Sequence, residues 1–161
     1  MRTGGNRSWL SILAIVGGTI VASCGGGPSS LSDLKSRPEL GIHPQNARFI
    51  SHNEHGDEQT IDGTLTAIVG DVFATNDDTD HIFEFYAAEL SQRGYVEDDG
   101  DLANIRTTVE ETVRVWRNGE TVARVAIYRK DDPQLPALPS DMPNGTLFEM
   151  ALTKAYSARP S

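Results

Sequence analysis

The feature that most constrains this chain is an uncharged apolar run close to its start. Residues 9–22 read WLSILAIVGGTIVA, and Arg2 and Arg7 precede them without any acidic residue. As a helix these 14 residues would cover roughly 21 Å, which is short of a bilayer hydrocarbon core of about 30 Å. A positive start, a short apolar stretch and small residues after it are typical of an export signal, so we expect this run to lie outside the folded domain.

The apolar run ends just before the only cysteine of the chain. The sequence Val21-Ala22-Ser23-Cys24 gives an aliphatic residue, two small residues and cysteine, and it resembles the lipobox of bacterial lipoproteins. The resemblance implies a diacylglyceryl group on Cys24 and cleavage between Ser23 and Cys24, so that residues 1–23 form a signal peptide. It also implies that the lipid anchors the protein to a membrane. The anchored domain would lie either on the outer side of the cytoplasmic membrane or at the outer membrane. There are two alternatives: a secretory signal without lipidation, in which the cysteine occurs by chance, and an uncleaved membrane anchor.

The segment after the cysteine is rich in glycine, serine and proline and shows no apolar period, which is typical of a flexible linker. We therefore predict a tether over residues 24–46, a single domain over 47–157 and a tail over 158–161. A total of 161 residues fits one domain.

The charge balance restricts the partners. The leader holds two of the 14 basic residues and none of the 23 acidic ones, which leaves a formal charge of −11 after Cys24. A domain this acidic repels phosphate backbones, so we expect no nucleic-acid partner. A single cysteine also excludes an internal disulfide and a cysteine-based metal site.

One helix is well marked. Acids and amides over residues 76–80 suit a helix N-terminus, and Gly94 suits a left-handed residue after the C-terminus, with Tyr95 folding back. Between them an apolar face follows helical spacing, through Ile82, Phe83, Tyr86, Ala87 and Leu90.

Alternating or β-branched residues predict strands on both sides of this helix. We expect strands within 47–50, 60–75, 95–97, 105–117, 120–130 and 146–156, and a loop over 131–145 that contains four prolines. The prediction is an α+β fold: one amphipathic helix on an antiparallel sheet of about four to six strands, in the order β-β-α-β-β-β-β. The helix ending Tyr-x3-Leu-x3-Gly-aromatic, at Tyr86 to Tyr95, resembles that of small secreted or lipid-anchored bacterial domains of unknown function.

The hairpin around Asn118-Gly119 admits two registers. A two-residue loop would place Arg124 beside Val113 and Val115, whereas a three-residue loop pairs odd positions with odd and gathers the valines on one face. The apolar pattern favours the second register. It gives the other face an aromatic and arginine stripe, residues of the kind enriched at binding hot spots. The candidate binding face is therefore Arg114, Trp116, Arg124 and Tyr128; the alternative is a face covered by the domain's own loop and last strand.

The sequence gives no catalytic constellation, and we predict no catalytic residue, no metal site and no cofactor. Residues 76–80 lack the glycine and glutamate that a calcium loop needs further on, and His52 and His55 would point to opposite faces of a strand. We expect a lipid-anchored binding or adaptor module of the cell envelope with an envelope protein as a possible partner. The alternatives are a subunit of a larger envelope assembly and a small metal-dependent envelope enzyme.

Overall fold

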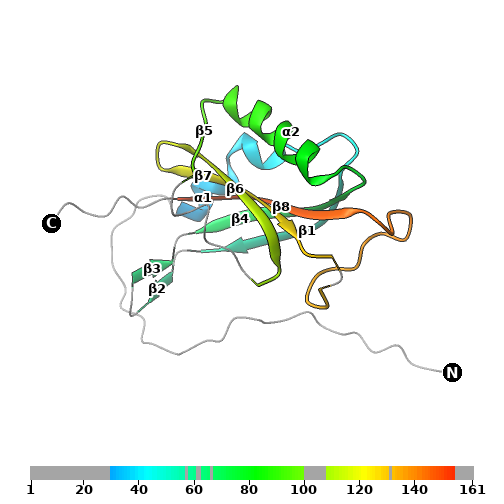
Figure 1. The fold of residues 1–161 in the computed structure, drawn as a ribbon. Coiled ribbons are helices and arrows are strands. Elements are labelled where there is room, and N and C mark those ends of the chain that lie inside the picture. Colours follow the sequence, from blue (N-terminus) through cyan, green and yellow to red (C-terminus); the bar gives the residue numbers. More distant parts are fainter. Residues whose placement is uncertain are drawn as a thin grey trace.

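The computed structural model describes residues 30–56, 58–60, 63–65, 67–99, 108–130 and 132–154. The elements in chain order are α1 Ser30–Lys35, the 3-10 helix η1 Pro38–Gly41, β1 Arg48–His55, β2 Glu58–Thr60, β3 Gly63–Leu65, β4 Ile68–Thr75, α2 Thr79–Ser91, β5 Val96–Glu97, β6 Glu110–Asn118, β7 Thr121–Tyr128 and β8 Thr146–Lys154 (Figure 1). The predicted signal peptide, lipid site Cys24 and tail lie outside the described residues. Within the described part, no helix is both long enough and apolar enough to cross a membrane.

Six strands form the main sheet in the order β1-β4-β8-β7-β6-β5, and every neighbouring pair is antiparallel. Strands β2 and β3 form a separate two-stranded sheet. The α+β class with an antiparallel sheet is thus as predicted. The predicted order of elements is wrong, because α1, η1 and the β2–β3 pair are additional. These pieces of three to six residues are too short to carry a periodic signal.

Helix α2 begins and ends as its sequence indicates. The Asp78 side chain caps the N-terminus by accepting a hydrogen bond from the backbone N–H of His81 at 2.9 Å. At the other end Gly94 has φ +80°, and the N–H of Tyr95 donates to the carbonyl of Leu90 at 3.1 Å. These contacts are those of a Schellman ending, which needs a residue without a Cβ penalty at positive φ.

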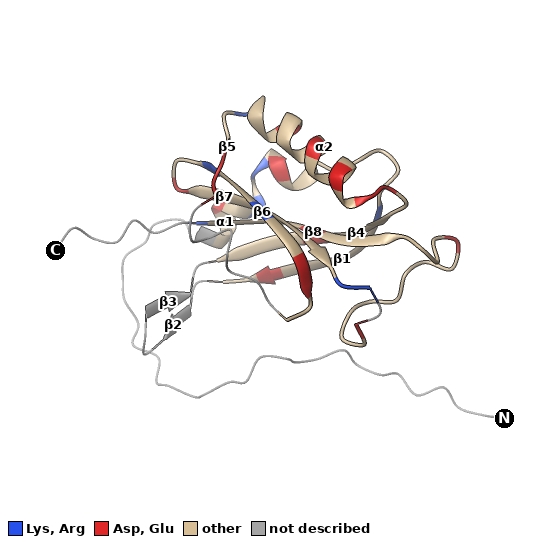
Figure 2. Ribbon diagram, viewed as in Figure 1, with Lys and Arg blue, Asp and Glu red and all other residues tan. Residues whose placement is uncertain are grey.

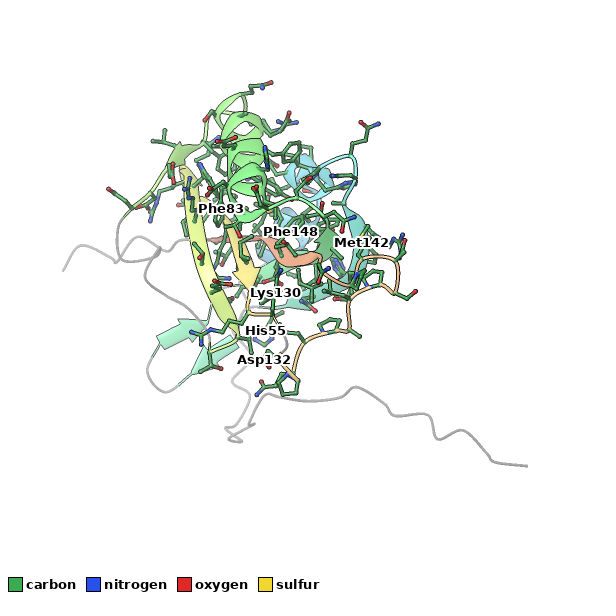
Figure 3. All side chains as sticks on the ribbon, turned by 45° about the vertical axis from the view of Figure 1, so that its right-hand side comes forward. His55, Phe83, Lys130, Asp132, Met142 and Phe148 are labelled. Carbon is green, nitrogen blue, oxygen red and sulfur yellow. The ribbon has the colours of Figure 1, made fainter. Side chains whose placement is uncertain are left out.

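The core lies between α2 and the sheet (Figures 1 and 3). Phe148 of β8 is fully buried at its centre, stacked on Phe73 with ring centroids 5.4 Å apart and edge-on to Tyr86 at 6.1 Å. Burial of each such side chain contributes roughly 1.5–3 kcal/mol. The buried members of this cluster on the sheet and on α2 are Val69, Phe73, Trp116, Ala123, Val125, Ile127, Phe148, Met150, Leu152, Ile82, Phe83, Tyr86 and Leu90.

The segment before β1 packs on this core, which corrects the predicted tether. Leu34 of α1 is fully buried, and Ile42 after η1 is 7% exposed. The Tyr86 hydroxyl donates to the Ile42 carbonyl at 2.9 Å, and the Tyr95 hydroxyl donates to the buried carboxylate of Glu39 at 3.3 Å. The domain therefore begins by residue 30 rather than at 47. A few apolar residues in a Gly-Ser-Pro background are enough to dock the segment.

The β6–β7 hairpin has a register that neither sequence alternative described. Asn118 pairs with Thr121 and Trp116 with Ala123, so the turn residues are Gly119, at φ +58°, and Glu120. Odd positions pair with even ones, and our choice of the three-residue loop is wrong. The physical reason is that both faces of the hairpin are buried, so an apolar pattern could not select one of them.

Candidate functional site

The register separates the four residues of the predicted binding face. Trp116 lies on the α2 side of the sheet, is 1% exposed and belongs to the main core. Arg114 lies on the same side, with its guanidinium carbon 4.7 Å from the centroid of the Phe83 ring. Arg124 and Tyr128 lie on the opposite side of the sheet, which we call the far face. The four side chains therefore do not form one surface.

The far face is covered in part by the proline-rich segment between β7 and β8, of which residues 132–145 are described (Figure 1). Leu135, Leu138 and Met142 of this segment pack against Tyr128 and its buried neighbours. Figure 3 shows His55 and Asp132 on the side of the sheet away from α2, and Phe83 and Phe148 beside that helix.

An ion pair fixes the segment to the first strand. The two guanidinium nitrogens of Arg48 donate to the two carboxylate oxygens of Asp141 at 2.8 and 2.6 Å. The bidentate hydrogen bonding holds the pKa of Asp141 below its usual range. The Lys130 ammonium adds a contact by donating to the Asn144 carbonyl at 3.3 Å. The C-terminal end of the segment is thereby held to β1 and to Lys130, which follows β7.

Between the segment and the sheet lies a cavity of about 580 Å³, which we call the loop pocket. Its lining is mostly aliphatic, and none of the lining side chains is charged. The lining residues are Ile50, Ser51, Asn53, Val72, Tyr128, Gln134, Leu135, Pro136 and Ala137.

One carboxylate lies beside the pocket. Glu149 of β8 pairs with Val72 of β4, which pairs with Ser51 of β1, so these three residues form one row across the far face. The Asn53 side-chain amide donates to Glu149 Oε1 at 3.1 Å. The Tyr128 hydroxyl also donates to this carboxylate, and burial followed by the nearby charge of Glu149 raises the pKa of Tyr128 well above its usual range. Two pocket-lining residues thus hold the carboxylate.

The carboxylate fits there because β4 has a glycine at the neighbouring position. A Cβ on Gly70 would lie 2.8 Å from the Ala151 Cβ and 3.1 Å from Glu149 Oε1. Only glycine avoids these two contacts. Gly70, Ala151 and Ala126 make this part of the far face shallow, which leaves room for the Glu149 carboxylate.

A second charged pair lies further along the same face. Arg124 donates to Glu110 at 2.5 Å, and the Glu110 side chain is 3% exposed. The Arg129 guanidinium also donates to the Glu110 carbonyl at 3.3 Å. The positive charge of Arg124, which acts on the Tyr128 hydroxyl, is therefore already paired with a buried carboxylate.

The α2 side of the sheet edge carries a different cluster. His52 Nδ1 lies 2.6 Å from an Asp71 oxygen and its Nε2 lies 3.4 Å from Glu54, which also pairs with Lys35 of α1 at 2.7 Å. Hydrogen bonding to Asp71 and then to Glu54 raises the pKa of His52. His52 thus joins the first two strands, and His55 lies on the far face, as expected for alternating strand positions. No set of three metal-ligating side chains suited to an ion occurs among the described residues.

Comparisons of the chain with protein-family models, with curated protein sequences and with solved structures found no match. The site must therefore be argued from its own geometry. Sequence reasoning named Tyr128 but missed Asn53, Glu149 and Gly70. These residues come from three strands that are distant along the chain, and no local motif connects them.

Proposed function

We propose that this protein is a lipid-anchored, non-catalytic binding module of the cell envelope, and that its ligand occupies the loop pocket. The lipobox resemblance at residues 21–24 supports the anchor. The pocket supports the binding role, and it is the observation that carries the proposal. Its volume of about 580 Å³ lies within the roughly 300–1,000 Å³ of pockets that hold small molecules. Mostly apolar walls with a few polar groups at one point are the usual composition of such sites.

A pocket-filling substitution tests the binding role. Ser51 lines the pocket from a strand, where an aromatic residue is well tolerated, so Ser51→Phe should fill the space without unfolding the domain. Full-length protein would be released from native membranes and its mass measured under non-denaturing conditions. We expect a small-molecule adduct on the wild type that Ser51→Phe loses.

The matched control is Ser91→Phe, at the exposed last residue of α2. It makes the same chemical change away from the pocket and should keep the adduct. Retention of the adduct by Ser51→Phe, or its absence from the wild type, would count against the proposal.

The anchor has its own test. Cys24→Ser removes the sulfur that the lipobox resemblance assigns to the lipid, so the protein should move from the membrane fraction to the soluble extracytoplasmic fraction. Intact mass of the wild type should show two or more acyl chains on a chain that begins at Cys24. A mature chain with an unmodified cysteine would contradict the anchor and leave the pocket unaffected.

The edge strand β1 favours a second candidate, a subunit of a larger envelope assembly. β1 has eight residues and ends the sheet order, and Phe49 on it is 55% exposed. Open strand edges can pair with another chain, although the bulge after Phe49 is a common protection against this. A photo-cross-linking p-benzoylphenylalanine in place of Phe49 should then capture one defined protein in native membranes. The same residue in place of Val96, on the opposite edge, should not.

A further inference from the structure

We infer that the loop pocket takes a small organic cation, a primary amine with an apolar body, whose ammonium group binds the carboxylate of Glu149. This inference rests on the proposed binding function, because it names the ligand class for the same pocket. Four features of the described residues carry it: the unpaired charge of Glu149, the balance of charge around it, the apolar walls, and the number of oxygen ligands.

Glu149 differs from most carboxylates on the sheet in having no cationic partner. Within the described part of the chain, no lysine, arginine or histidine lies within ion-pair distance of it. Its two donors, the Asn53 amide and the Tyr128 hydroxyl, are neutral. A carboxylate has about four acceptor positions, so two donors leave room for an ammonium group.

The surrounding charge also favours a cation. Three charged groups act on the Tyr128 hydroxyl: Glu149, Glu110 and Arg124. Arg124 is paired with Glu110 at 2.5 Å, so of these three groups Glu149 is the one without an oppositely charged partner. The whole chain carries −9, and acidic residues lie along α2, β1 and β6 (Figure 2). Such a field attracts cations and repels carboxylates and phosphates.

The walls define the rest of the ligand. Ile50 and Val72 come from the sheet, and Leu135, Pro136 and Ala137 come from the segment that covers it. These five side chains offer neither charge nor hydrogen bonds, so the part of the ligand that packs against them is apolar. Burial of apolar area at about 25 cal/mol per Å² would supply much of the affinity.

The small number of oxygen atoms available to coordinate an ion favours an organic cation over a metal ion. Calcium takes six to eight oxygen ligands, and magnesium demands octahedral geometry. Here one carboxylate is accompanied by an amide that donates and a hydroxyl that donates. An ammonium group needs only acceptors at hydrogen-bond distance, and one carboxylate provides them.

Three aromatic probes of similar size and different charge test the inference: benzylammonium, benzyl alcohol and benzoate. The protein would be the full lipidated chain in phosphatidylcholine nanodiscs, with empty nanodiscs as the blank. Because the Asn53 side-chain amide donates to Glu149, its ¹⁵N–¹H signals report directly on the carboxylate. We expect benzylammonium to shift these signals at the lowest concentration, benzyl alcohol to require more, and benzoate to have no effect.

Glu149→Gln keeps the size of the side chain and removes its charge. We expect it to weaken benzylammonium binding by about tenfold or more and to change benzyl alcohol binding by less than about twofold. Glu84→Gln, on the exposed face of α2, removes the same charge from the chain and should leave all three affinities unchanged. Circular dichroism of both variants checks that they fold.

The outcomes separate the inference from the proposed function. If benzyl alcohol binds the pocket as tightly as benzylammonium, or Glu149→Gln binds both like the wild type, the cation inference is overturned and a pocket for neutral ligands remains. If none of the probes shifts any pocket residue in a folded protein, the cation inference is overturned, and the proposed binding function is then decided by the native-mass comparison of the wild type with Ser51→Phe.

Discussion

The two faces of the sheet are built on different principles. The α2 face is filled by large side chains, with Phe148, Tyr86 and Trp116 at most 1% exposed. The far face carries glycine and alanine in its central rows, a partly buried Arg124–Glu110 pair, and a loop as its cover. Close packing leaves no room for a ligand, whereas the irregular segment over the far face leaves a cavity between itself and the sheet. The α2 face therefore has the close packing that stabilises a fold, and the far face has the space that the proposed ligand requires.

The largest effect should come from emptying the α2 face. Phe148→Ala removes a fully buried ring that contacts Phe73 and Tyr86, and should lower the free energy of unfolding by about 3–5 kcal/mol. Leu135→Ala, in the partly buried cover of the far face, should cost about 1–2 kcal/mol. Denaturant titration followed by circular dichroism measures both. Equal losses would mean that the two faces contribute equally to stability.

A glycine substitution tests how tightly the far face is built. Gly70→Ala places a Cβ 2.8 Å from that of Ala151 and should destabilise the domain by about 1–3 kcal/mol, because two strands must move apart. Gly41→Ala, where no atom lies within 4 Å, should change stability by less than about 1 kcal/mol in either direction. Thermal unfolding of the two variants in parallel checks the difference. A neutral Gly70→Ala would mean that the sheet relaxes there at little cost.

Two tyrosine hydroxyls, one on each face, give a smaller and more specific comparison. Tyr86→Phe leaves the buried carbonyl of Ile42 without its donor, which should cost about 1–3 kcal/mol and loosen the segment before β1. Tyr128→Phe takes one donor from Glu149, which keeps Asn53 and is only partly buried, so the loss should be at most about 1 kcal/mol. Hydrogen exchange locates the loosened region in each variant. The reverse order would assign the stabilising role to the far face.

The smallest effect should be a dependence on pH. The pKa of His52 is raised above the ordinary 6.5, first by its hydrogen bond to Asp71. The stabilisation of the fold by protonated His52 is therefore complete below about pH 6.5 and is lost as the pH rises through the raised pKa. The melting temperature of the wild type should fall toward that of His52→Asn over this range. Parallel curves for the two proteins would show that His52 contributes nothing to joining β1 and β4.

Local signals predicted α2 well. Its cap at Asp78, its apolar face and its ending at Gly94 and Tyr95 lie within 18 consecutive residues, and each is satisfied by neighbours in sequence. Local signals did not predict the hairpin register. Both faces of the hairpin are buried, with Val113 and Val115 on one and Trp116 on the other. The alternation of residues therefore indicated the strands but not which face α2 would cover.

The candidate site could be predicted only in part for a related reason. Tyr128 can be recognised as a candidate by its residue type. Its partner Glu149 cannot be distinguished in the sequence from the other acidic residues of an acidic chain. The hydrogen bond between Asn53 and Glu149 joins positions 96 residues apart. The pocket exists because a proline-rich segment returns over the sheet, and the Arg48–Asp141 pair that holds it spans 93 residues. Contacts at such separations follow from the strand order, which the sequence pattern does not specify.

The docking of the segment before β1 sets the reach of the domain. Because α1 begins at Ser30, only six chain steps separate it from Cys24, and even a fully extended chain would span roughly 21 Å. With the lipid on Cys24 as proposed, the domain is confined to a thin layer at the bilayer surface. Diffusion of the domain is then nearly two-dimensional. Ligands that partition to the lipid headgroups encounter the domain at a raised effective concentration.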